Sequence, residues 1–139
     1  MTSIAVPPGY ELCDMPDGGF AKLVGPLFIR HTEAGPRFAF RAQSKHVNAR
    51  GVVHGGMMTT FADQALGLTI QRALDTIDIA TVNLNCDLVA VARAGDLIEG
   101  EATITRVTTR LIFVRGTITC GDVVLTNASG IWARIRSSA

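Results

Sequence analysis

The sequence has 139 residues, which fits one ordinary domain. Thirteen Lys and Arg residues nearly balance twelve Asp and Glu residues, so the formal charge is +1, which argues against a dedicated nucleic-acid-binding protein because such proteins present a basic face. Hydrophobic residues make up 47% of the chain and charged residues 18%, which excludes intrinsic disorder. So large an apolar share in a short chain suggests that some of it is buried against a second copy.

The three cysteines, Cys13, Cys86 and Cys120, show no metal-binding spacing and cannot all pair, which indicates unpaired thiols in a reducing compartment. No segment approaches the roughly 20 apolar residues of a membrane span. Residues 1–10 lack the basic start of a signal peptide. We therefore expect a cytoplasmic protein that does not enter a membrane.

Taken in chain order, residues 1–24 are rich in Pro and Gly and predict an irregular or short helical N-terminal arm. Residues 25–139 form the single domain. Its first strand is expected over Leu27–Thr32, its second over Arg37–Ala42, and the turn between them at Gly35-Pro36. Residues 44–53 are polar and predict a loop.

The stretch Met57–Leu74, opened by His54-Gly55-Gly56, predicts a long helix. Apolar or small residues recur there at helical spacing, namely Met58, Phe61, Ala62, Ala65, Leu66 and Thr69, and Leu68 and Ile70 extend the apolar surface around the cylinder. A helix that is apolar nearly all round belongs in the middle of a fold.

After residue 78 the hydrophobic period changes to two, which predicts strands. In the first strand, Ile79–Val91, the even-numbered residues from Ala80 to Ala90 form an apolar face, and Thr81, Asn83, Asn85 and Asp87 form a polar one. Further strands are expected over Leu97–Val107, Leu111–Cys120 and Val123–Ile135, with Gly121-Asp122 as a two-residue hairpin turn.

Two strands, one long helix and four more strands joined by mostly short turns favour an α+β architecture. Short turns require antiparallel neighbours. A curved antiparallel sheet wrapped around a central helix buries the helix most economically.

Asp63 is the only formally charged residue between His54 and Gln71. A carboxylate in so apolar a helix is costly unless it is paired, although an Asp on a solvent-facing position is a plain alternative. Gly55-Gly56 lies at the expected start of this helix, where free backbone N–H groups can stabilise an oxyanion, although two glycines also suit an ordinary turn.

The spacing of these two features predicts an assembly. Gly55 and Asp63 are eight residues apart, or roughly 12 Å along one helix. A base and an oxyanion donor must both lie near about 3 Å of the reacting centre. If both residues are catalytic, two antiparallel copies of the helix must complete each other's sites, and the enzyme is at least a dimer.

These residues resemble a known family. Asn48, Gly51-Val52-Val53-His54-Gly55-Gly56 and Ala62-Asp63 are similar to the motif of the hotdog-fold acyl-CoA thioesterases, in particular the phenylacetate-pathway (PaaI-like) group. The resemblance extends over about residues 25 to 136 and includes the order of the strands. It implies a hotdog fold and a thioester hydrolase.

The resemblance also implies roles for individual residues. Asp63 is the general base that activates water, or the nucleophile that forms a mixed anhydride. The N–H of Gly55 polarises the thioester carbonyl, and Gly56 allows close approach. His54 and Asn48 orient the thioester and assist the leaving thiolate.

Thr81 matches a family position that holds the attacking water, and Asn83 is a weaker candidate on the same expected strand face. Met57 and Phe61, on the helix, are candidates for lining the acyl pocket, although packing in the core explains them equally well.

Coenzyme A carries phosphates, so arginines near the mouth of the site are candidate contacts. Arg93 lies in a predicted turn, and Arg106 and Arg110 flank another. Arg50 is a similar candidate beside Asn48. Solvated surface arginines are the plain alternative for each.

No metal or separate cofactor is expected, because a thiolate is a good leaving group and His31, His46 and His54 lack metal-ligand spacing. No Ser lies in a nucleophile-elbow context. The expected partners are an acyl-CoA substrate and further copies of the chain, as a dimer at minimum and a homotetramer in full.

Two other functions stay open: a hotdog enoyl-CoA hydratase or dehydratase, and a non-catalytic acyl-CoA-binding protein. A His directly before Gly55-Gly56 with Asp63 nine residues later fits the thioesterase better. The sequence leaves open whether the acyl group is aryl or fatty, and the N-terminal arm is a candidate cover for the pocket.

Overall fold

The computed structural model describes residues 4–15 and 18–135. Within these residues, seven strands form one antiparallel sheet in the order β1-β2-β3-β5-β6-β7-β4. The strands are β1 (Glu11–Leu12), β2 (Phe28–Thr32), β3 (Gly35–Arg41), β4 (Ile79–Leu88), β5 (Leu97–Val107), β6 (Leu111–Cys120) and β7 (Val123–Arg134). The helices are α1 (Gly19–Val24), the short 3-10 helix η1 (Ser44–His46) and α2 (Gly55–Leu74).

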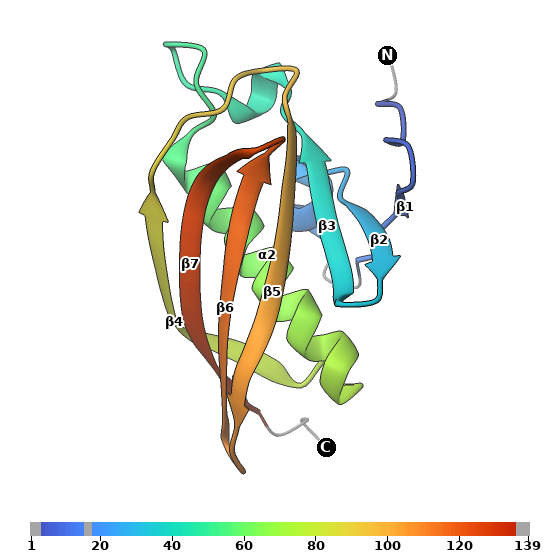
Figure 1. Ribbon diagram of the computed structural model, residues 1–139, viewed down its shortest axis with the longest axis vertical. Helices are drawn as coiled ribbons and strands as arrows, with labels where there is room; N and C mark the ends of the chain where they lie inside the picture. Colours follow the sequence, from blue (N-terminus) through green and yellow to red (C-terminus); the bar gives the residue numbers. More distant parts are fainter. Residues whose placement is uncertain (1–3, 16–17, 136–139) are drawn as a thin grey trace.

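The sheet curves around α2, which lies behind it in Figure 1. Ten of the twenty residues of α2 are buried, including all those whose helical spacing indicated a central helix. They pack against the inner faces of the strands, where Phe38, Phe40, Ile98, Ile112 and Trp132 are also buried. The predicted α+β architecture, a curved antiparallel sheet around one long helix, is confirmed.

Both ends of α2 follow from local chemistry. The helix begins at Gly55, where the sequence places it, and His54 caps it. It ends at Leu74, because Asp75 takes the left-handed conformation (φ 50°) and the polar residues that follow offer no further apolar face.

Three predicted details of the sheet are wrong. The turn between β2 and β3 falls at Glu33-Ala34, because Gly35 (φ 120°) already pairs with Thr32. β4 ends at Leu88 rather than at residue 91. Directly after Leu88, the Val89 N–H donates to the carbonyl of Leu125.

The third error concerns strand order. β4 pairs with β7 and lies at the edge of the sheet, so it is not the neighbour of β5 that its place in the sequence suggests. The connection over residues 89–96 is a crossing segment rather than a hairpin turn, and Arg93 within it pairs with Val52 of the loop before α2.

The N-terminal segment is attached to the sheet. β1 pairs with β2, and the Tyr10 hydroxyl donates to the carboxylate of Glu99 on β5. Arg37 of β3 binds the same carboxylate at 3.1 Å. No helix in the described part of the chain is long and apolar enough to cross a bilayer.

Candidate active site

The strongest site feature is a pair of side chains contributed by α2 and β4. The Thr81 hydroxyl donates a hydrogen bond of 2.7 Å to Oδ1 of Asp63. Asp63 lies in the ninth position of α2 and is half-buried, and Thr81 lies near the start of the edge strand. The lone carboxylate of the helix therefore has one oxygen held by a hydroxyl.

A β-bulge explains how Thr81 reaches the helix. The pairing of β4 with β7 shifts between Thr81 and Asn83, because Thr81 lies opposite Trp132 and Asn83 already lies opposite Ile131. Val82 is the extra residue, and it is 59% exposed. Such a bulge reverses the alternation of faces along a strand.

Because of the bulge, the prediction that Thr81 and Asn83 share one face of this strand is wrong. Thr81 shares the inner face with Leu84 and Cys86, whereas Asn83 and Asn85 lie on the outer face. The amide of Asn85 donates to Oδ1 of Asn83 at 2.6 Å. The structure therefore separates Asn83 from Thr81 and Asp63.

The start of α2 has one capped N–H and one open N–H. Nδ1 of His54 accepts a hydrogen bond of 2.9 Å from the Gly56 N–H, which places the ring proton of a neutral His54 on Nε2. Within the described residues, the Gly55 N–H has no acceptor. The helix tip thus presents a free donor together with the positive end of the helix dipole.

Glycine at position 56 has a specific steric reason. A Cβ there would lie 3.0 Å from Nδ1 of His54, so any side chain would push the capping ring away. A Cβ at Gly55 would instead lie 3.1 Å from the end of the flexible Leu88 side chain on β4. The end of β4 therefore lies beside the helix tip.

Asn48 supports the loop before the helix. Its Oδ1 accepts from the backbone N–H groups of Arg50 (2.9 Å) and Val52 (3.3 Å), and its own N–H donates to the Val52 carbonyl. The Asn48 side chain thereby fixes the backbone that leads to His54, a structural role that the motif alone does not reveal.

His46 also holds the segment that leads to α2. Its Nε2 lies 2.6 Å from the Val24 carbonyl, its Nδ1 accepts from Gln43 N–H at 3.0 Å, and its carbonyl accepts from His54 N–H at 2.8 Å. Burial lowers the pKa of His46, so the ring is neutral at pH 7. Its neighbour His54 begins the helix from this fixed point.

A cavity of about 200 Å³ opens beside Asp63 and Thr81. Its lining comes from α2, including Gln64 and Gln71, from the start of β4, and from Trp132 of β7 and Met15 of the N-terminal arm. Met57 and Phe61 are not in this lining, and Phe61 packs edge-on against Phe40 in the core, with ring centroids 4.8 Å apart. Sequence reasoning missed Met15 and Trp132 here, because only the fold brings them to the helix.

Cys86 is a further neighbour that the sequence did not single out. It lies on the inner face of β4, one residue pair beyond Leu84. Burial raises the pKa of its thiol, contact with Thr59 of α2 lowers it, and the negative charge of Asp63 raises it again. The thiol is therefore protonated at neutral pH, and it lies close enough to Asp63 to be affected by that charge.

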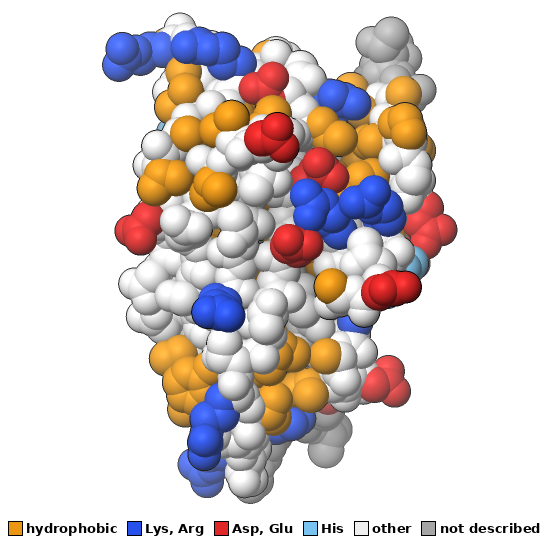
Figure 2. Space-filling view, in the orientation of Figure 1, with side chains coloured by type: hydrophobic (Ala, Val, Ile, Leu, Met, Phe, Trp, Pro, Cys, Tyr) orange, Lys and Arg blue, Asp and Glu red, His pale blue; other side chains and the backbone are white. Residues whose placement is uncertain are grey.

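The three candidate arginines lie at two ends of the molecule. Arg93 lies on the segment between β4 and β5, near the loop before α2, whereas Arg106 and Arg110 lie at the turn between β5 and β6. The eleven residues of β5 separate the two ends by roughly 35 Å. Figure 2 shows Lys and Arg side chains gathered at both ends of this face.

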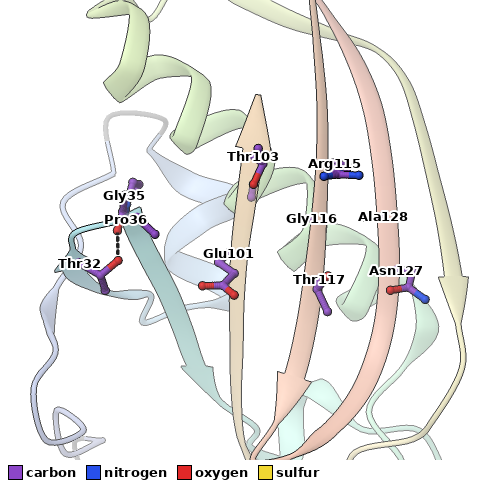
Figure 3. Close-up of a pocket in the computed structure, with 12 residues that line it drawn as sticks. Thr32, Gly35, Pro36, Glu101, Thr103, Arg115, Gly116, Thr117, Asn127 and Ala128 are labelled. Carbon is purple, nitrogen blue, oxygen red and sulfur yellow. Dashed lines mark hydrogen bonds between the residues drawn. The ribbon is translucent and has the colours of Figure 1, made fainter. Parts of the chain in front are cut away.

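A different cavity, of about 500 Å³, lies on the outer face of the sheet. Figure 3 shows Glu101, Thr103, Arg115, Thr117 and Asn127 on neighbouring strands there. None of the predicted catalytic residues lines it. Within the described residues, no group of three or more His, Cys, Asp or Glu could hold a metal ion.

Comparisons with known proteins point to one family. Residues 50–126 match the family model of the thioesterase superfamily. A Pseudomonas aeruginosa protein named "Putative esterase PA0474" is 31% identical over 112 residues, which cover 79% of this chain and 84% of that protein.

Solved structures give the same result for the fold. A phenylacetic acid degradation-related protein of Ralstonia eutropha JMP134, described as a "putative thioesterase", is 26% identical with a TM-score of 0.75, covering 86% of this chain and 92% of that one. Zebra fish thioesterase superfamily member 2 (18% identity, TM-score 0.77, 86% and 88% covered) and the BH2602 protein of Bacillus halodurans, solved with CoA (22%, 0.72, 79% and 74%), share the fold.

Proposed function

We propose that this chain, which belongs to the thioesterase superfamily and is by that membership a thioester hydrolase, cleaves an aryl- or fatty-acyl-CoA to the free acid and coenzyme A. The proposal depends on one observation. Asp63 of α2 is hydrogen-bonded to Thr81 of β4, and the tip of α2 offers the open N–H of Gly55. These supply the carboxylate and the oxyanion donor that acyl transfer requires.

The proposed reaction uses Asp63 as the general base. Its carboxylate takes a proton from a water molecule held by the Thr81 hydroxyl, and the water oxygen attacks the carbonyl carbon of the thioester. The oxyanion that forms is stabilised by a Gly55 N–H. The C–S bond then breaks, and the coenzyme A thiolate leaves and takes up a proton.

Direct attack by Asp63 is the other route for the same residues. The carboxylate would displace the thiolate and form a mixed anhydride, which water then hydrolyses. A single turnover in ¹⁸O-labelled water tests this second route. Label in the Asp63 carboxylate indicates the nucleophile, because it enters only when water attacks the Asp63 carbon of the anhydride.

Each site requires two copies of the chain. Gly55 and Asp63 lie eight residues apart on one continuous helix, or roughly 12 Å. A single carbonyl cannot contact both within one protomer. We therefore expect the oxyanion donor to be Gly55 of the partner subunit, in a dimer with two equivalent sites.

The edge strand supports this arrangement. Thr81, near the start of β4, contacts Asp63, and Leu88, at its end, lies beside Gly55. If two copies of β4 pair antiparallel about a two-fold axis, the start of one strand lies against the end of the other. That pairing brings Asp63 toward Gly55 of the partner subunit and covers a ten-residue unpaired edge.

The same antiparallel arrangement unites the arginines. Arg106 and Arg110 at one end of a protomer would come near Arg93 and Arg50 at the opposite end of the partner. We propose that these four side chains bind the phosphates of coenzyme A, because guanidinium groups suit phosphate geometry. We expect further pairing of dimers into a tetramer, and action in the cytoplasm, where free thiols persist.

The proposal is tested by measuring thiol release from acyl-CoAs of varied chain length and aromaticity. Asp63→Asn keeps the shape of the side chain but removes the base, and we expect kcat to fall by roughly 10²–10⁴ while the elution volume of the assembly stays the same. Undiminished turnover in this variant would reject the mechanism. Addition of water to an enoyl-CoA in place of thiol release would support a hydratase.

The dimeric site is tested by mixing two inactive variants. Asp63→Asn lacks the base, and Gly55→Pro lacks the oxyanion donor. In a mixed dimer one site carries both defects and the other carries neither, so random mixing should restore about a quarter of the wild-type activity. No recovery after the subunits have exchanged would contradict a shared site.

A further inference from the structure

Met15 contributes to the lining of two cavities. The first is the cavity of about 200 Å³ beside Asp63, and the second has about 410 Å³ and lies under the N-terminal arm. Among the described residues, Met15 alone lines both. This segment therefore borders the candidate active site, although it lies 48 residues before Asp63 in the sequence.

The first cavity has a mixed polar and apolar lining. The polar side chains are those of Asp63, Thr81, Gln64 and Gln71, and the apolar ones include Leu68, Ile79, Trp132 and Met15. Its volume equals that of about seven water molecules at roughly 30 Å³ each, below the roughly 300 Å³ at which sites for drug-sized ligands begin. It suits a short acyl chain or a single aromatic ring.

The space depends on small residues at its wall. A Cβ added at Gly67 would lie 3.4 Å from Nε1 of Trp132, so a side chain larger than that of Ala would crowd the Trp132 ring that lines the cavity. Met15 lines the same cavity, and its flexible thioether side chain adapts to irregular spaces.

The second cavity is the larger one. Leu12, Cys13, Ala21, Pro26 and Leu27 contribute to its lining, and Lys22 and Lys45 also line it. Lys45 donates to the Gly25 carbonyl at 2.6 Å. An acyl chain that extended past Met15, which lines both cavities, would enter this largely apolar space.

The position of Met15 is fixed by its neighbours. The Cys13 N–H donates to the Leu27 carbonyl at 2.8 Å, and the Cys13 side chain is 5% exposed. Arg72 of α2 lies beside the Cys13 thiol. Met15 itself packs against the hydrophobic core. The residue is thus anchored two positions away and is not a free surface side chain.

We infer that Met15 is the residue that limits the length of the acyl group, by closing the cavity beside Asp63 and separating it from the second cavity. The inference rests on the proposed thioesterase function and extends it to the choice of substrate. The wild-type protein should therefore prefer short aliphatic or single-ring acyl groups. A variant with a smaller side chain at position 15 should prefer long chains.

The test compares kcat/KM for butanoyl-, hexanoyl-, phenylacetyl- and dodecanoyl-CoA in wild type, Met15→Ala, Met15→Leu and Met15→Phe. Each methylene moved from water into an apolar cavity is worth roughly fourfold in affinity. Met15→Ala should therefore raise the ratio of dodecanoyl to hexanoyl kcat/KM by at least about tenfold. Met15→Leu conserves volume and should keep the wild-type ratio.

Met15→Phe supplies the opposite change and decides the matter if Met15→Ala does not fold. A larger ring should lower the ratio of hexanoyl to butanoyl kcat/KM. Leu23→Ala is the matched control, because Leu23 is an apolar residue of α1 that is 72% exposed and lines neither cavity. It should leave every ratio unchanged.

The outcomes distinguish this inference from the proposed function. If wild type cleaves no acyl-CoA, the proposed function fails. If wild type cleaves acyl-CoAs and the folded Met15 variants share its chain-length profile, the function stands and the role of Met15 is rejected. A wild-type preference for dodecanoyl-CoA would also overturn the inference.

Discussion

A single substitution at the tip of α2 can remove the backbone N–H of Gly55. Gly55 is the first residue of α2, and His54 before it has extended backbone angles (φ −58°, ψ 136°). Proline is favoured at the first position of a helix, and the residue before proline prefers such angles. Proline at position 55 should therefore remove the N–H without breaking the helix.

Gly55→Pro is predicted to lower kcat by roughly 10²–10³ with little loss of stability, because it removes an oxyanion donor. Gly55→Ala is the control, since it adds a Cβ but keeps the N–H. Thiol-release kinetics and urea unfolding measure the two effects. Equal activities of the Pro and Ala variants would show that the N–H has no role in catalysis.

His46 predicts a dependence of stability on pH. Burial lowers its pKa in the folded protein, the Val24 hydrogen bond opposes this, and the charge of Lys45 adds to it. The unfolded chain then binds a proton at a higher pH than the folded chain. Stability from the neutral ring is complete above about pH 6.5 and is lost as the pH falls below that value.

Urea unfolding between pH 8 and pH 5 checks this sign. The free energy of unfolding of wild type should fall with pH across this window, and His46→Gln should be less stable at pH 8 but have a smaller slope. A variant with the wild-type slope would assign the pH dependence to other groups. The sequence shows His46 only as an isolated histidine, because Val24 reaches it through the fold and the local contact with Gln43 forms only in the cap of η1.

At the scale of elements, β4 is the strand where sequence and structure differ most. Its alternating residues predict one regular strand, and Val82 fits the apolar face of that pattern. A bulge adds one residue without disturbing local composition, so the pattern cannot reveal it. Thr81 therefore faces Asp63, and Asn83 faces outward.

The other elements were predictable for a stated reason. The helix α2 and the strands β5 and β6 are long segments with strong periodicity. Both bounds of β5 and β6, and the end of α2, agree with the pattern. Strand order was less predictable, because the residues that pair between β4 and β7 are 38 to 55 positions apart and no local signal encodes the pairing. The lining of the cavity beside Asp63 was missed for the same reason.

The open edge of β4 predicts an effect of charge on assembly. Val82→Lys places a cation on the exposed bulge, where it should oppose pairing with a second copy. We expect a smaller assembly by analytical ultracentrifugation, and a specific activity that rises with protein concentration.

Val123→Lys is the matched control for that prediction. Val123 is also an exposed strand valine, but it pairs with Cys120 of β6 beside the turn between β6 and β7, beyond the last pair of β4 with β7. It should leave the assembly and the activity unchanged. A fully active monomer of the Val82 variant would contradict the shared site.

At the scale of the molecule, one polar cluster ties the N-terminal segment to the sheet. Tyr10 donates to Glu99, Arg37 binds both Glu99 and Glu101, and the guanidinium of Arg30 lies 5.2 Å from the centroid of the Tyr10 ring. Burial raises the pKa of Glu99, but the hydrogen bonds from Tyr10 and Arg37 outweigh it and hold that pKa below its usual range.

Tyr10→Phe keeps the ring but removes the hydroxyl, and we expect it to destabilise the protein by about 1–2 kcal/mol in urea unfolding at pH 7. The contribution of Glu99 is present above about pH 4.3 and is lost as the pH falls through its lowered pKa. Glu101→Gln removes an exposed ion pair and should cost less than about 1 kcal/mol. An equal cost for both variants would contradict the anchoring role of Tyr10.

The surplus residue in β4 has a consequence for which changes of length such a fold tolerates. A single codon removed at position 82 would restore regular pleating and still leave Thr81 opposite Trp132, on the face that meets the helix carboxylate, while every other strand kept its register. Descendants of this gene that lack that one triplet would be expected to keep the contact between threonine and carboxylate, and alignments that place the gap elsewhere would hide the equivalence.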